Sequence, residues 1–285
     1  PLFLRNSLLE IARPNLFFDL GDIKIIPHLL HDKYLNNKTI NNCRQALYGS
    51  ENLNLPVSPL SITEHYCDLL YQALPHRSLF GIGGDHSVSY PLINSWLKNK
   101  NMSNKNIGII HFDAHTDLLE ERLGIDLCFA TWVSQILPNL KNPENLIQIG
   151  IRSSGQTKDF WERKYGIKQF WADEVNKLGA KSISNQIIAQ LNKNNIDELY
   201  ISFDIDALDI SYASATGTPE ANGITPDTAI MILMILSQHF KFTGADMVEI
   251  APWVNRSEES NAGPEPLTTL LNSAAISNFI INNLS

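Results

Sequence analysis

Six short runs of apolar, strand-forming residues recur along the chain, and longer segments with helical periodicity separate them. The runs cover residues 22–26, 79–83, 106–112, 146–151, 198–203 and 245–250. Most of them are almost continuously apolar rather than alternating, which is typical of strands that are buried on both faces. Strand, helix and strand at this spacing predict right-handed βαβ units, and therefore a parallel sheet with helices on both sides.

Local signals indicate where two of the intervening helices begin. Ser61 is expected to cap a helix in the segment SITEHYCDLLYQAL, with Glu64 completing a capping box. Thr225 is expected to cap another helix, with Pro226 at the first helical position. No linker separates two stretches of different composition, so residues 1–285 are expected to form a single domain.

The composition argues against several classes of protein. Hydrophobic residues make up 44% of the 285 residues, which is enough for a full core. The formal net charge is −8 and no basic run occurs, which argues against a nucleic-acid partner. No apolar run reaches the ~18 residues that a membrane helix needs, and the start lacks the features of a secretory signal. The three cysteines include no CxxC pair, which favours a reducing, cytoplasmic setting.

Ionisable side chains follow or end four of the predicted strands. They are His86 after the second run, Asp113, His115 and Asp117 after the third, Asp204 and Asp206 after the fifth, and Glu249 within the sixth. Ligands of parallel sheets bind beyond the carboxyl ends of the strands, so these side chains are expected to converge at one edge. Alternate residues of extended chain share a face, so the three side chains of DxHxD project together, as do those of DxD.

Four aspartates and two histidines this close together predict a metal centre. Without cations, the carboxylates would repel one another and raise one another's pKa. Two divalent ions would cancel four negative charges, and oxygen-rich ligation with some imidazole suits Mn²⁺. A two-metal centre can hold a bridging water and ionise it to hydroxide near neutral pH. Each motif alone is ambiguous, because DxHxD is as often a capped surface turn and FDID is more often a strand end. Three such motifs in this order favour the metal centre.

With these motifs in place, the sequence resembles the ureohydrolases, the family of arginases, agmatinases, formiminoglutamases and guanidino-acid hydrolases. The matching motifs are GGDHS (83–87), HFDAHTD (111–117), SFDIDALD (202–209), TGTPE (216–220) and DMVEIAP (246–252), with a weaker match in DLGDI (19–23). Together they span most of the chain. The resemblance implies a three-layer α/β/α fold around a mostly parallel sheet, arginase-like, with a dinuclear Mn²⁺ site.

The resemblance also implies roles for individual residues. It assigns the metal ligands as His86, Asp113, His115, Asp117, Asp204 and Asp206, the same six that the spacing points to. It places Thr218 and Glu249 in the substrate pocket, with Glu249 facing the guanidinium-type group, and Asp117 and Glu249 are the expected catalytic residues. Asp85 either orients a ligand histidine or is a turn residue. His111, Ser202 and Asp209 are expected to be strand, packing and turn residues.

The chain departs from the family pattern at several places. Family members commonly carry a proton-shuttling histidine shortly after DxHxD, yet residues 118–132 contain none. Cys128 lies closest to the expected position, and its thiol is either a catalytic replacement for the histidine or inert packing. The usual GTGTP reads SATGTP, and Asn255 stands where an acid follows the EIAP segment. The family's opening strand would lie upstream of Pro1, so it has been removed or the chain begins differently.

These features together predict a Mn²⁺-dependent hydrolase that cleaves a linear C–N bond of a guanidino or formimino substrate. HFDAHTD looks more agmatinase-like than arginase-like, which favours an amine such as agmatine, although Arg122 could bind a carboxylate instead. One alternative is formiminoglutamase-type specificity. Another, suggested by the missing histidine, is a metal-binding relative that has lost catalysis and serves as a binding or regulatory protein. By analogy with the family, a trimer or hexamer is expected.

Overall fold

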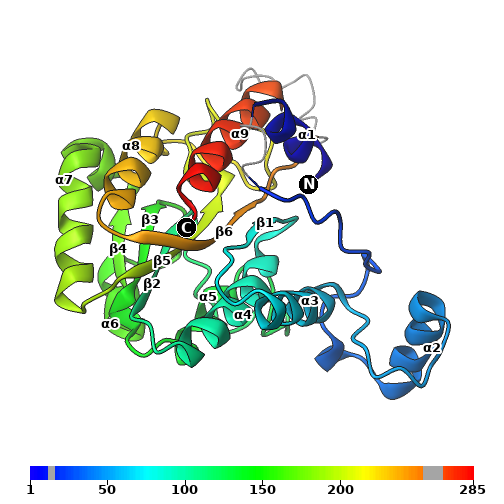
Figure 1. Ribbon diagram of the computed structural model, residues 1–285. Coiled ribbons are helices and arrows are strands. Elements are labelled where there is room, and N and C mark those ends of the chain that lie inside the picture. Colours follow the sequence, from blue (N-terminus) through cyan, green and yellow to red (C-terminus); the bar gives the residue numbers. More distant parts are fainter. Residues whose placement is uncertain (12–16, 253–265) are drawn as a thin grey trace.

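The computed structural model describes residues 1–11, 17–252 and 266–285, and a parallel sheet forms its centre (Figure 1). The strands of this sheet are β1 (Phe80–Ile82), β2 (Ile107–Phe112), β3 (Leu146–Ile151), β4 (Lys168–Trp171), β5 (Glu198–Asp204) and β6 (Lys241–Val248). Their spatial order is β1-β6-β5-β2-β3-β4, and every neighbouring pair is parallel. The carboxyl ends of β2, β5 and β6 therefore meet at one edge.

Helices cover both faces of the sheet, so the expected three-layer α/β/α arrangement is confirmed (Figure 1). One face carries α1 (Leu2–Ile11), α7 (Ala172–Lys193), α8 (Pro226–Ser237) and α9 (Pro266–Asn283). The other carries α3 (Pro59–Ala73), α4 (Ser89–Met102), α5 (Trp132–Ile136) and α6 (Lys158–Tyr165). The remaining helix, α2 (Asn37–Tyr48), projects from the side of the molecule (Figure 1).

Alternation along the strands produces a separate core on each face of the sheet. In β2, Ile110 and Phe112 pack in the cluster that contains residues of α7, α8 and α9. Ile107 and Ile109 point the other way and pack with residues of α4 and α5. Both sets are apolar because helices cover both faces, which is why the run looks continuous in the sequence. The two cores hold β2 rigidly up to the residues that follow it.

The predicted runs at 79–83, 106–112, 146–151 and 198–203 each correspond to a strand, and β1 lies within the first of them. β2, β3 and β5 agree with the predicted runs to within one residue. β6 was predicted at 245–250, but it begins four residues earlier, at Lys241, and ends two residues earlier, at Val248. The predicted strand at 22–26 is wrong, because this segment is largely exposed coil without a partner strand. Arg5 of α1 holds the coil instead, through Asp19 at 2.6 Å and Asp22 at 3.0 Å. The short edge strand β4 was not predicted.

One of the two predicted helix starts is confirmed. Thr225 caps α8 by accepting a hydrogen bond from the backbone N–H of Thr228, and Pro226 follows at the first position. The prediction that Ser61 caps α3 is wrong, because α3 begins at Pro59 after Ser58. Proline at a first helical position starts the helix earlier, and the Ser61 hydroxyl instead accepts a hydrogen bond from the backbone N–H of Asp32 at 3.0 Å.

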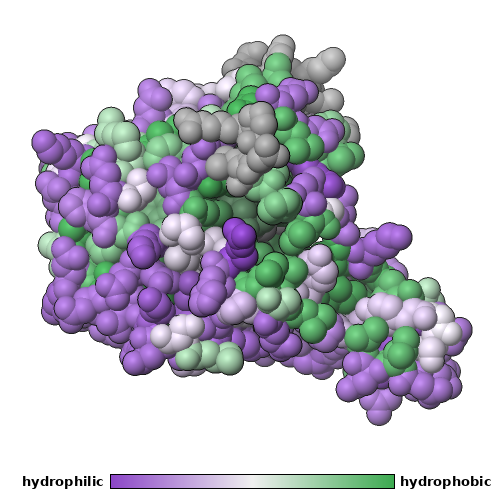
Figure 2. All heavy atoms as spheres, viewed as in Figure 1, coloured by the Kyte–Doolittle hydropathy of each residue, from purple (hydrophilic) through white to green (hydrophobic). Residues whose placement is uncertain are grey.

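The surface differs from one side of the molecule to the other. Figure 2 shows mostly hydrophilic residues on the left of the view and more apolar residues on the right, where α1, α3 and the N-terminal segment lie. Exposed apolar side chains on these elements include Leu2, Leu9, Phe18, Leu20 and Leu69. In the described part of the chain, none of the helices combines the length and the hydropathy required to cross a bilayer.

Candidate metal centre

The ionisable residues singled out in the sequence converge where β1, β6, β5 and β2 end. His86 opens the 3₁₀ turn η2 (His86–Val88) after β1, and Asp204 is the last residue of β5. Asp206 lies in the 3₁₀ turn η5 (Ile205–Ala207), and the DxHxD residues follow β2 directly. Asp113, Asp117, Asp204, Asp206 and His86 are buried, and His115 is half-buried.

One group of this cluster surrounds the imidazole of His86. Its Nδ1 atom lies 3.0 Å from Asp113 Oδ2, 3.2 Å from Asp117 Oδ2 and 3.1 Å from Asp204 Oδ2. This nitrogen is buried and makes no hydrogen bond. The other ring nitrogen, Nε2, lies 3.1 Å from the Ser202 hydroxyl, which donates to Asp246. Because Ser202 donates its own proton to Asp246, it accepts the His86 Nε2–H, and Nδ1 of the neutral ring presents a lone pair to three carboxylates.

The second group surrounds His115. Its Nδ1 atom lies 3.3 Å from Asp113 Oδ1 and 3.2 Å from Asp206 Oδ2. Asp113 thus offers one carboxylate oxygen to each group, and its side chain could bridge two cations. On the outer side, His115 Nε2 lies 3.6 Å from Glu220 Oε1, so a carboxylate faces the nitrogen that points away from the cluster.

The electrostatics of the cluster fit divalent cations. Burial would lower the pKa of His86, but Asp113 and Asp204 outweigh it and raise that pKa well above its ordinary value. Burial, followed by Asp113, raises the pKa of Asp117, and burial with Asp206 and Asp113 raises that of Asp204. Burial would also raise the pKa of Asp113, yet its three histidine partners hold it well below the ordinary value. Metal-free, the cluster therefore binds protons at sites where cations would neutralise the same charge.

Three residues that the sequence did not flag as functional contact the cluster. His111, expected to be a plain strand residue, places Nε2 2.9 Å from Asp113 Oδ2. Trp132 donates its indole N–H to Asp117 Oδ2 at 2.8 Å. Ser202, expected to be a packing residue, supports His86 as described above, so that interpretation was wrong. Asp85 is a turn residue, because its carboxylate accepts the backbone N–H of Ser87 at the start of η2.

Glu249 and Thr218 lie on two loops beside the cluster. Glu249 Oε1 accepts the backbone N–H of His86 at 2.9 Å, and Thr218 donates its hydroxyl to Asp206 Oδ2 at 3.2 Å. Burial is the main reason that the pKa of Glu249 rises to about 7. Glu249 and Asp117 both have positive φ, 61° and 52°, which is uncommon outside glycine and costly enough to suggest a functional constraint.

Cys128 lies in the loop that precedes α5. It is buried, and its thiol lies 3.8 Å from the Thr131 hydroxyl, which also accepts the Cys128 backbone N–H. The thiol forms no hydrogen bond with the six cluster residues, all of which belong to the described part of the chain. Asn255, where the sequence departs from the family pattern, lies outside the described residues.

Two acidic residues of the same loop, Glu120 and Asp126, are paired within the protein. Lys33 contacts Asp126 at 2.9 Å, and the Tyr34 hydroxyl donates to the same carboxylate while it accepts the backbone N–H of Leu127. Glu120 pairs with Lys164 at 2.8 Å. These two carboxylates are therefore paired with lysines of the protein and are less available to a cationic substrate.

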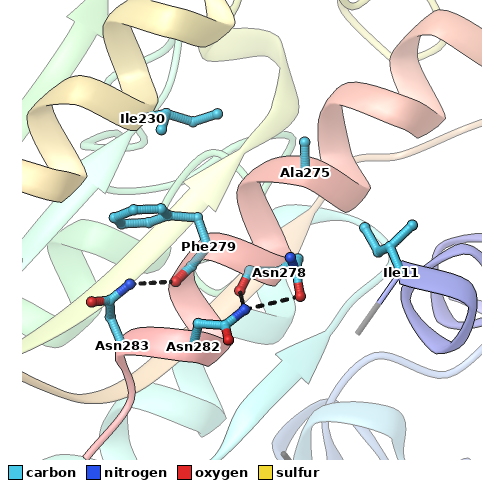
Figure 3. A pocket seen from close by; sticks show the side chains of 7 residues that line it. All are labelled: Ile11, Ile230, Ala275, Asn278, Phe279, Asn282 and Asn283. Atoms are coloured by element: carbon cyan, nitrogen blue, oxygen red, sulfur yellow. Dashed lines mark hydrogen bonds between the residues drawn. The ribbon is translucent and has the colours of Figure 1, made fainter. Parts of the chain in front are cut away.

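A separate hollow of about 520 Å³ lies between α9, α8 and α1 (Figure 3). It is lined by Ile11, Ile230, Ala275, Asn278, Phe279, Asn282 and Asn283. The side-chain amide of Asn283 donates to the backbone of Phe279, and that of Asn282 donates to Asn278, so these groups are satisfied within α9. The lining shares no residue with the cluster, and the hollow has no evident part in its chemistry.

Comparisons with known proteins show which family and which fold the chain resembles. A family model described as the arginase family matches residues 16–270. Agmatinase from Bacillus anthracis is 32% identical over 202 residues, which are 70% of this chain and 64% of the agmatinase, so less than two thirds of that relative is covered. The structure of a hypothetical agmatinase from Burkholderia thailandensis matches with a TM-score of 0.63 and 28% identity, over 78% of this chain and 64% of that chain. Arginase from Bacillus cereus shares the fold, with a TM-score of 0.68 and 23% identity over 98% of this chain and 91% of that chain.

Proposed function

The chain belongs to the arginase family, and we propose that it is a metal-dependent hydrolase that cleaves a linear C–N bond of a guanidino or formimino compound. One observation carries this proposal. A buried, unpartnered imidazole nitrogen of His86 faces three carboxylate oxygens, directly beside a second group around His115. Hydrophobic packing does not need such an arrangement, whereas a pair of divalent cations does.

We propose two Mn²⁺ ions per chain. His86, Asp113, Asp117 and Asp204 would hold one ion, and Asp113, His115 and Asp206 would hold the other. Oxygen ligands with one imidazole at each position suit Mn²⁺ better than a metal that prefers thiolates. When bound, such a pair supplies a nucleophile at neutral pH by lowering the pKa of water, and it polarises the substrate.

Glu249 is proposed to bind the cationic group of the substrate. Its Oε1 atom is fixed by the backbone N–H of His86, so the carboxylate is positioned relative to the cluster. With a pKa near 7, it is largely ionised in slightly alkaline solution and can pair with a guanidinium. Thr218, tied to Asp206, would line the same pocket.

Asp117 is proposed to move the proton that the departing amine must gain. Its Oδ2 atom is held by the indole N–H of Trp132, so the carboxylate has a fixed position within the cluster. A carboxylate at this place can accept a proton from water and pass it to the leaving nitrogen. Cys128 would share this role only if its thiol turned from Thr131 toward the cluster.

The favoured substrate is an amine such as agmatine. The relatives named agmatinase support this choice, with 32% and 28% identity. The side chain of Arg122 lies 5.1 Å over the Phe129 ring, where it is exposed and could instead select a substrate carboxylate. Substrates that carry a carboxylate, such as formimino and guanidino acids, are therefore tested beside agmatine.

A substrate screen tests the activity. The protein is loaded with Mn²⁺ and incubated with agmatine, arginine, guanidino acids and formiminoglutamate, and release of urea, ammonia or formamide is measured. We expect turnover of at least one compound, with agmatine first, and its loss in Glu249→Gln. Two bound ions without turnover of any compound would favour the alternative, a binding or regulatory relative that has lost catalysis.

The setting of the protein is proposed by analogy. A cytoplasmic location fits the three free cysteines, and a trimer or hexamer of one-domain chains fits the family. The apolar side chains exposed on α1 and the N-terminal segment would be covered in such an assembly. Light scattering that gives three or six times the 32.0 kDa chain mass supports the oligomer, and any other mass refutes it.

A further inference from the structure

A row of buried polar residues crosses the sheet one to three residues before the strands end. Five strands contribute one residue each, in register: Gln169 of β4, Gln148 of β3, His111 of β2, Ser202 of β5 and Asp246 of β6. All five are fully buried. The half formed by Ser202 and Asp246 supports His86, as described above. The other half, which we call the glutamine relay (Gln169, Gln148 and His111), leads to Asp113.

Hydrogen bonds join the relay in one direction. The indole N–H of Trp171 donates to Gln169 Oε1 at 2.9 Å. Gln169 Nε2 then donates to Gln148 Oε1 at 2.7 Å, and Gln148 Nε2 lies 2.9 Å from His111 Nδ1. His111 Nε2 lies 2.9 Å from Asp113 Oδ2. The chain of contacts therefore runs from the edge strand to the carboxylate shared by the two groups of the cluster.

Both ends of the relay fix this direction. An indole nitrogen can only donate, so Gln169 must present its oxygen to Trp171 and its amide nitrogen to Gln148. At the other end, Gln148 Nε2 also donates to the backbone carbonyl of Thr116 at 2.7 Å, and a carbonyl can only accept. The two requirements agree on the orientation of Gln148. Its amide N–H therefore faces His111 Nδ1, which must accept, and the ring proton of neutral His111 lies on Nε2.

We propose that His111 is a positioning residue: the glutamine relay holds it as the Nε2–H tautomer, and it orients Asp113 to bridge two cations. This inference rests on the metal centre of the proposed function. His111 itself is not a ligand, although it lies close enough to be one, because both of its nitrogens are engaged. Outer hydrogen bonds of this kind align ligands before the metal arrives.

The effect on Asp113 follows from its two oxygens. Oδ2 receives the His111 proton and faces His86 Nδ1, while Oδ1 receives the backbone N–H of His115 at 2.6 Å. One donor on each oxygen fixes the carboxylate plane between the two groups. The opposite tautomer would place a lone pair of His111 against Oδ2, and the carboxylate would be free to turn away.

The tautomer is measured first, in the metal-free protein. Nitrogen-15 NMR of histidine-labelled protein distinguishes protonated from unprotonated ring nitrogens, and His111→Phe identifies the signals of His111 by their loss. We expect Nδ1 to be unprotonated and Nε2 to be protonated. Gln148→Glu is measured at alkaline pH, where the ionised carboxylate can only accept, and Nδ1 should become protonated. A wild-type ring protonated at Nδ1, or an Nδ1 signal unchanged in Gln148→Glu, overturns the proposal.

Metal affinity is measured next, by Mn²⁺ titration followed by electron paramagnetic resonance. His111→Phe keeps a ring but removes the donor, and it should weaken binding about 10- to 100-fold. His111→Gln retains an N–H donor of similar reach and should restore most of the affinity. The matched control is His239→Phe, the same change at an exposed histidine beyond α8, which should bind as the wild type does.

Two outcomes overturn the positioning role. His111→Phe could bind Mn²⁺ as tightly as His239→Phe, or His111→Gln could bind as weakly as His111→Phe, in which case the ring matters only for packing. If His111→Phe does not fold, Gln148→Met identifies the NMR signals of His111, because loss of the amide perturbs the neighbouring ring. In that case, weak Mn²⁺ binding by His111→Gln refutes the positioning role. Wild-type protein that binds two ions without turnover refutes the hydrolase and leaves this test intact.

Discussion

Asp113 is the residue on which both groups of the cluster depend. Its two oxygens face His86 on one side and His115 on the other, and His111 Nε2 contacts Oδ2. The sequence predicted the convergence of Asp113 with its neighbours, because the position of a residue that follows a strand can be predicted once the strand itself is assigned correctly. It did not predict His111 or Trp132, because their roles depend on which side chains lie opposite them in space.

Glu249 is expected to set the lower pH limit of activity. Burial raises its pKa to about 7, so the carboxylate becomes neutral as the pH falls through 7 and loses its attraction for a cationic substrate. The profile of kcat/KM should therefore fall below about pH 7, and the change should appear mainly in KM. A profile measured from pH 6 to pH 9 tests this, and a KM that stays constant across that range contradicts it.

Cys128 is expected to be packing rather than a catalytic group. Its thiol contacts Thr131, and its backbone is tied to the same hydroxyl. Cys128→Ala should therefore leave kcat within a few-fold of the wild type. A fall of ~10²-fold or more, as expected on loss of a proton-transfer group, would instead show that the thiol replaces the family's histidine.

Among the elements, the turn that carries the ligand Asp206 is joined to the loop with Glu220 by Arg152, which follows β3. Its guanidinium lies within hydrogen-bond distance of six backbone carbonyls in three segments: Gly150, residues 206–208 and residues 220–221. A glycine at 223 lets the last of these segments approach, because a Cβ there would lie 2.4 Å from the backbone nitrogen of Asp209. The turn with Asp206 and the loop with Glu220 thus form one unit.

Removal of this guanidinium should destabilise the fold. Arg152→Met leaves several buried carbonyls without donors, and we expect the free energy of unfolding to fall by about 3 kcal/mol. Urea denaturation measures the change. The exposed Arg77→Met is the matched control and should cost under ~0.5 kcal/mol. Equal stability of the two variants would show that the carbonyls find other partners.

The strands show how much of the secondary structure could be predicted from one sequence. Runs such as 146–151 were predicted because burial on both faces leaves a continuous apolar pattern. The segment 22–26 (DIKII) is also rich in isoleucine but has no neighbouring strand, and pairing cannot be deduced from composition. The polar row was missed for the same reason. Its sequence signal is a polar residue inside each of these strands, and only the register aligns Gln148 with His111.

The whole molecule should respond to metal and pH together. In the metal-free protein, the pKa values of His86, His115, Asp117 and Asp204 are raised. A group with a raised pKa stabilises the fold while it is protonated and loses that contribution as the pH rises, so the metal-free protein should become less stable between pH 6 and pH 8. Metal binding needs the deprotonated ligands and strengthens over the same interval.

The gap in melting temperature between Mn²⁺-loaded and metal-free protein should therefore widen from pH 6 to pH 8. Calorimetry at three pH values under a fixed excess of Mn²⁺ measures it. The variant Asp204→Ala, which lacks a ligand of the first group, should show a smaller gap at every pH. A gap that stays constant or narrows with pH would contradict proton and metal competition at the cluster.

The central claim is that the six cluster residues hold two manganese ions, and anomalous diffraction from Mn²⁺-soaked crystals tests it most directly. We expect two peaks per chain, one beside His86 Nδ1, Asp113, Asp117 and Asp204, and the other beside Asp113, His115 Nδ1 and Asp206. The second peak should disappear in Asp206→Ala. No peak at the cluster, or a single peak that Asp206→Ala leaves unchanged, would contradict the dinuclear centre.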